Sequence, residues 1–134
     1  MGRALLTHEG LCRHARLITV AWVAYWVLLT GLLHSPRLPS SPIPLDARAM
    51  VAHFVAFALL TLGCVLSARA RMGAPTYRWL GTWLVVFVVY AGLSELLQPL
   101  TNRDGDVWDW LANVAGVVVV MALARPRARY AAQT

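Results

Sequence analysis

The stretch from Glu95 to Gly116 gathers polar and charged side chains within an otherwise apolar sequence. It contains one Glu, three Asp, one Arg, one Gln and two Asn. A charged side chain at membrane depth costs about 2.5–3.5 kcal/mol on insertion scales, so a chain that carries several together has a use for them. We therefore expect this stretch to hold the functional site.

The spacing within this stretch predicts two polar helix faces that meet across a short turn. Glu95 and Gln98 are three residues apart and share one face of a helix, which should end before Pro99. Residues 101–105 then have the composition of a turn. The helix that follows carries polar or small residues within roughly an 80° arc at Asp106, Asp109, Asn113 and Gly116.

Together with His53, these residues could perform acid/base chemistry at a membrane–water boundary. Glu95 and His53 could exchange protons, and the planar guanidinium group of Arg103 could hold a phosphate in a bidentate way. Alternatively, these charges form ion pairs whose only role is to hold the two helices of the hairpin together. Apolar side chains would give the same stability without the cost of removing charges from water. We assign catalytic roles to His53, Glu95, Arg103 and Asp109, and binding or supporting roles to Gln98, Asp106 and Asn113.

Binding of a hard cation is an alternative use of the same carboxylates. Asp106 and Asp109, at positions i and i+3, would suit Mg²⁺ together with Glu95. This spacing is weakly specific, and the sequence lacks the G-x-S-x-G, H-E-x-x-H and P-loop patterns. We therefore assign no cofactor and no metal ligand, and keep Mg²⁺ as the alternative.

The composition is that of a small integral membrane protein. The chain has 134 residues, of which 59% are hydrophobic and 13% are charged, which is too apolar for an ordinary soluble domain. All 12 basic residues are Arg. They lie between and beside the apolar runs and do not cluster on a soluble face, so we expect no nucleic-acid partner. Cys12 and Cys64 have no metal-binding or disulfide spacing and receive no role.

Four apolar runs predict an all-α, four-helix transmembrane bundle that forms one domain over residues 1–134, with its core at 46–124. Each run is long enough to cross a hydrocarbon core of about 30 Å. The predicted helices cover residues 17–33, 49–66, 79–98 and 107–124. The first run could instead be a signal peptide, but it is long for one and no A-x-A cleavage site follows it.

The segments between the helices differ in composition. Residues 35–46 contain four prolines and read as an extended connector, whereas residues 67–78 read as a basic loop. Ala52 and Ala56 form a small-x-x-x-small pair that predicts close helix approach, so His53 should face protein. Trp79 and Trp83 are placed to anchor the start of the third helix at the interface.

The distribution of Arg predicts the orientation in the membrane. Nine Arg lie before the first helix, between the second and third, and after the fourth, against three in the other two loops. The positive-inside rule then places both termini in the cytoplasm. The candidate site residues consequently lie toward the extracytoplasmic face.

The same residues carry a resemblance to the VanZ-like family of small bacterial membrane proteins, over about residues 46–124. One part is a His followed by an aromatic residue, here His53-Phe54. The other is a block with fixed spacing that comprises Glu95, Gln98, Arg103, Asp106, Asp109, Asn113 and Gly116. The family often has Asp-Lys shortly before the His, where this chain has Ala49-Met50.

The resemblance implies a multi-pass protein of the bacterial cytoplasmic membrane with a role in the cell envelope. The family's namesake is associated with low-level resistance to the glycopeptide teicoplanin. We expect an outer-face site that binds a phosphate-bearing lipid or lipid-linked cell-wall precursor and, if the protein is a hydrolase or transferase, processes its head group. The alternative is a non-catalytic accessory protein that shields or sequesters an envelope component. A proton or small-solute pathway is less favoured, because the inner halves of the helices carry few polar residues.

Overall fold

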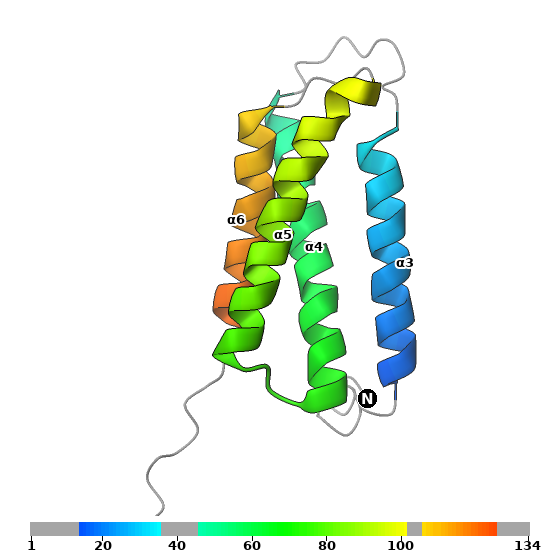
Figure 1. Ribbon diagram of the computed structural model, residues 1–134, viewed down its shortest axis with the longest axis vertical. Coiled ribbons are helices and arrows are strands. Elements are labelled where there is room, and N and C mark those ends of the chain that lie inside the picture. The colour runs from blue at the N-terminus through cyan, green and yellow to red at the C-terminus, as the bar shows by residue number, and fades with distance from the viewer. Residues whose placement is uncertain (1–13, 36–45, 102–105, 126–134) are drawn as a thin grey trace, which may run out of the picture.

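Four antiparallel α-helices make up the bundle in the computed structural model, which describes residues 14–35, 46–101 and 106–125 (Figure 1). The helices are α3 (Ala15–Leu33), α4 (Asp46–Met72), α5 (Tyr77–Leu97) and α6 (Val107–Leu123). A short 3-10 helix, η1 (Gln98–Thr101), continues α5. The predicted all-α, four-helix bundle is confirmed.

Three of the described helical segments are long and apolar enough to cross a membrane, namely Ala15–Leu33, Ala49–Met72 and Tyr77–Thr101. The fourth helix, α6, is apolar but has only 17 residues, or about 25 Å at 1.5 Å per residue. Large hydrophobic side chains are exposed along all four helices, as expected for a surface that faces lipid rather than water. The chain is therefore a helical membrane protein.

Helix α4 is longer at both ends than the predicted helix over 49–66. It begins at Asp46 and continues to Met72, so the first part of the predicted basic loop over 67–78 is helical and that prediction is wrong there. Arg and Ala are good helix formers, and a change from apolar to basic side chains does not by itself end a helix. The chain turns at Gly73, whose φ of 80° suits a residue without a Cβ atom.

Two arginines in the last turns of α4 bond to neighbouring helices. The Nη2 atom of Arg69 donates a hydrogen bond to the carbonyl oxygen of Ala124 at 3.4 Å. The Nε atom of Arg71 donates to Oγ1 of Thr19 at 3.1 Å. These contacts tie the end of α4 to the end of α6 and the start of α3.

Aromatic side chains fill the space between α3 and α5. The ring of Trp26 lies 5.6 Å from that of Phe87 and 5.5 Å from that of Tyr90, measured between centroids. The ring of Trp22 lies 5.6 Å from that of Trp83. Trp83, predicted as an interface anchor, is thus packed inside this aromatic row, where such pairs add stability beyond simple area burial.

Helix α6 packs tightly against the backbone of α4 at Gly116. A Cβ atom added to Gly116 would collide with the carbonyl oxygen of Phe54 and lie 3.0 Å from the backbone nitrogen of Ala58. The prediction that Ala52 and Ala56 mark the close approach is therefore misplaced, since Ala52 is exposed. Gly116 supplies the contact and lets the first half of α6 lie directly against α4.

Candidate functional site

Local signals end α5 and start α6 where the sequence predicts. The α-helix ends at Leu97 and tightens into η1 at Gln98. The next residue, Pro99, cannot donate a backbone hydrogen bond to the helix. Asp106 is the N-cap of α6, and its Oδ1 accepts a hydrogen bond from the backbone nitrogen of Trp108 at 2.9 Å. This cap satisfies one of the free N–H groups at the start of the helix.

Five predicted site residues meet inside the bundle at the end formed by the start of α4, the end of α5 and the start of α6. Each has at most 8% of its surface exposed. They are His53 on α4, Glu95 on α5, Gln98 at the start of η1, and Asp109 and Asn113 on α6. We refer to these five residues as the polar cluster.

Asn113 lies at the centre of the polar cluster. Its Nδ2 atom donates a hydrogen bond to Oε1 of Glu95 at 3.1 Å, and its Oδ1 atom lies 3.1 Å from Nδ1 of His53. The other Glu95 oxygen, Oε2, accepts a hydrogen bond from Nε2 of Gln98 at 2.9 Å. One amide therefore links the ionisable groups of α4 and α5 from a position on α6.

His53 also faces two carboxylates at ion-pair distance. Its Nδ1 atom lies 3.7 Å from Oε1 of Glu95, and its Nε2 atom lies 3.5 Å from Oδ2 of Asp109. Because Asn113 uses Oδ1 as an acceptor in this network, Nδ1 of His53 carries a proton. The Nε2 atom faces the Asp109 carboxylate, so the ring of His53 has a carboxylate near each of its two nitrogens.

Two buried polar oxygens at or beside the polar cluster are unpaired, one on Gln98 and one on Ser94, a residue that the sequence analysis did not single out. Within the described part of the chain, Oγ of Ser94 and Oε1 of Gln98 have no hydrogen-bond partner although both side chains are fully buried. The two residues are four apart and lie on one face of α5 and η1. Buried polar atoms are normally paired, so both can accept a hydrogen bond from a ligand or a water molecule.

A pocket of about 410 Å³ opens beside the polar cluster, between the end of α5 and the start of α6. Glu95 is the cluster member that lines it, whereas His53 and Asp109 are not part of its described lining. The described lining consists of Gly92, Glu95, Leu96, Pro99, Asp106, Val107 and Trp110.

The side chain of Asp106 is exposed and is not part of the polar cluster. It caps α6 and lies at the pocket rim. Arg103, the predicted phosphate clamp, lies outside the described residues. No group of three or more His, Cys, Asp or Glu in the described ranges is arranged to hold a metal ion.

Fold and site together define a small helical membrane protein with a buried array of ionisable side chains next to a lateral pocket. Comparisons with protein-family models, with curated proteins and with solved structures find no match to this chain.

Proposed function

We propose that this chain is a VanZ-like protein of the bacterial cytoplasmic membrane that binds a phosphate-bearing lipid or lipid-linked cell-wall precursor at the polar cluster. The motif residues that carry the resemblance support the proposal by their placement. His53, Glu95, Gln98, Asp109 and Asn113 lie in mutual contact although they come from three helices. Gly116 sets the distance between two of those helices.

The observation that carries the proposal is that a buried carboxylate forms part of the wall of an otherwise largely apolar lateral pocket. Glu95 faces a space that is also bounded by Leu96 and Val107, both of which are exposed on the outside of the bundle. A ligand that enters from the membrane between α5 and α6 would place acyl groups against these side chains. Its polar head group would then lie against Glu95.

The contacts of the cluster support the following roles. Glu95 contacts the head group and exchanges protons with His53. The Nε2 atom of His53 lies 3.5 Å from Oδ2 of Asp109, which holds the ring in place. Gln98 and Asn113 fix the Glu95 carboxylate by donating to one oxygen each. Arg103 follows η1 in the sequence, and a guanidinium group there would hold phosphate oxygens as the lipid enters.

Two versions of this function differ in chemistry. In the first, the protein is a hydrolase or transferase that acts on the head group, with Glu95 and His53 as the acid/base pair. In the second, it is an accessory protein that shields an envelope lipid, and the hydrogen bonds from Gln98 and Asn113 that immobilise Glu95 suit this role as well. Both versions are compatible with a contribution of this protein to resistance against teicoplanin-type glycopeptides.

The two versions are separated by incubating the purified protein in nanodiscs with phosphate-bearing lipids, using diacylglycerol with the same acyl chains as the control. We expect the phosphate-bearing lipid to be retained in preference to diacylglycerol, as measured by native mass spectrometry. Release of a modified head group would identify an enzyme, and retention without turnover an accessory protein. Equal retention of both lipids would contradict the proposal.

A further inference from the structure

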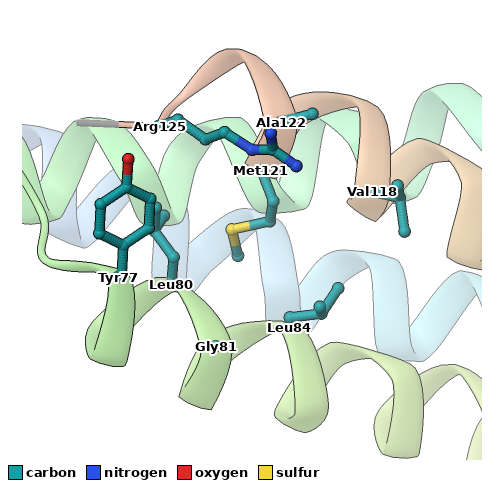
Figure 2. A pocket seen from close by; sticks show the side chains of 8 residues that line it. All are labelled: Tyr77, Leu80, Gly81, Leu84, Val118, Met121, Ala122 and Arg125. Atoms are coloured by element: carbon teal, nitrogen blue, oxygen red, sulfur yellow. The ribbon is translucent and has the colours of Figure 1, made fainter. Parts of the chain in front are cut away.

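A second groove lies on the seam between α5 and α6, at the end of the bundle opposite the polar cluster. Its volume is about 220 Å³. Leu84 of α5 and Met121 of α6 line its sides, and Arg125 lies at its outer end (Figure 2). The groove is therefore apolar along its length and basic at its mouth.

The groove is open because α5 has a glycine where a larger side chain would fill it. Gly81 lines the groove, and a Cβ atom added there would meet nothing within 4 Å. Glycine in the interior of a helix is less favourable than Ala. Gly92, which lines the pocket beside the polar cluster, is offset from Gly81 by only about 20° around the helix. Both openings thus lie on one face of α5.

Arg125 is placed to meet an anionic group at the mouth of this groove. It follows the last turn of α6 and is exposed, and its side chain folds back along α6, so that the guanidinium group lies beside Met121 and Ala122 (Figure 2). By contrast, Arg69 and Arg71 at the same end of the bundle bond to neighbouring helices.

The charges at this end of the bundle favour an anionic partner. The acidic residues whose side chains the structure describes, Glu95, Asp106 and Asp109, all belong to the opposite end. The end with the groove carries Arg16, Arg69, Arg71, Arg78 and Arg125. Basic side chains next to a membrane surface attract anionic lipids, and an Arg stem can lie along apolar surface while its head reaches the interface.

We propose that this groove binds one anionic phospholipid, with the phosphate at Arg125 and an acyl chain lying along Gly81, Leu84 and Val118. The groove runs along the bundle between two helices that both face the membrane, so a chain from the adjacent leaflet enters it without crossing a polar barrier. A zwitterionic phospholipid fits the same groove but gains less at Arg125, since it has no net charge. This site is separate from the polar cluster and does not depend on the function proposed there.

The test is native mass spectrometry of the protein released from nanodiscs that contain equal amounts of phosphatidylglycerol and phosphatidylcholine. We expect preferential retention of one phosphatidylglycerol. The Arg125→Gln variant should lower that retention about fivefold, whereas Arg16→Gln, which removes an exposed arginine from α3 at the same end, should leave it unchanged. Equal retention of the two lipids by the wild type would overturn the proposal, as would equal effects of the two variants.

A second pair of variants tests whether the groove itself holds the lipid. Gly81→Leu places a side chain in the groove without a clash at its Cβ atom, and we expect it to abolish selective retention. Gly31→Leu is the matched control, because a Cβ atom at this exposed glycine of α3 also meets nothing within 4 Å. Undiminished retention by Gly81→Leu would show that the lipid binds elsewhere.

Discussion

Asn113 is the residue on which the geometry of the polar cluster depends most. It is 0% exposed and uses both ends of its amide, donating to Glu95 and accepting from His53. No other side chain type offers a donor and an acceptor at this length and spacing without also carrying charge or an extra methylene group. Asn113 therefore orients two ionisable groups that come from two other helices.

We expect Asn113→Ala to destabilise the protein by about 1–3 kcal/mol, because it leaves a buried Glu95 oxygen and a buried His53 nitrogen without a partner. We expect a change near the lower end of this range, because a single hydrogen bond between helices of a membrane protein contributes little to the free energy of unfolding. Unfolding in detergent micelles measures the change, with Thr82→Ala as a control, since Thr82 is exposed and bonds only within its own helix turn. Equal stability of the two variants would contradict this role for Asn113.

Glu95→Gln and Arg103→Lys should both abolish function in a protein that is still inserted in the membrane. The first substitution keeps the shape and one acceptor oxygen but removes the charge and the ability to take up a proton. The second keeps the positive charge but loses the bidentate fork, which a phosphate clamp needs and a neutralising ion pair does not. An envelope phenotype or lipid assay at matched expression measures both. Near-normal activity in both variants would favour the purely structural reading of the cluster.

At the scale of the helices, Gly116 determines whether the cluster can form. We expect Gly116→Ala to cost about 1–3 kcal/mol through overpacking against the backbone of α4 and to move Asp109 away from His53. Gly31→Ala should be neutral or slightly stabilising, because Gly31 has open space around it and Ala is the better helix former. Thermal unfolding compares the two variants, and a Gly116→Ala variant as stable as the wild type would contradict the tight packing of α6 against α4 at this residue.

The helices could be predicted from sequence because apolar runs of this length must satisfy their backbone hydrogen bonds internally in a membrane. Their ends were harder to predict. The sequence placed the end of α4 where Arg residues begin, but Arg69 and Arg71 extend the helix because they find partners on α6 and α3. The end of α5 was predicted correctly, since Pro99 imposes it by covalent geometry.

The members of the cluster could be predicted from their spacing, but the contacts between them could not. Positions i and i+3 define a face of one helix, whereas the pairing of His53 with Asn113 depends on the distance between α6 and α4. That distance is set by Gly116, and the sequence pattern pointed to Ala52 and Ala56 instead. Ser94 was missed because a lone Ser in an apolar helix most often bonds to its own backbone.

At the scale of the whole molecule, the orientation in the membrane remains a prediction from the Arg distribution. We expect a Cys at position 74 to be labelled only from the cytoplasmic side and a Cys at position 40, outside the described residues, only from the outside. A membrane-impermeant thiol reagent measures this in a background without Cys12 and Cys64. The reverse pattern would place the polar cluster at the cytoplasmic face.

The measurement that tests the central claim most directly is the identification, by mass spectrometry, of lipid that co-purifies with the protein when no lipid is added. We predict that the wild type carries two phosphate-bearing lipids. At equal expression, Glu95→Gln should lose the lipid bound at the polar cluster, whereas Gly81→Leu should lose only the anionic phospholipid of the groove, because its substitution lies at the other end of the seam. The same lipid complement in the wild type and Glu95→Gln would contradict the claim that the polar cluster is a lipid head-group site.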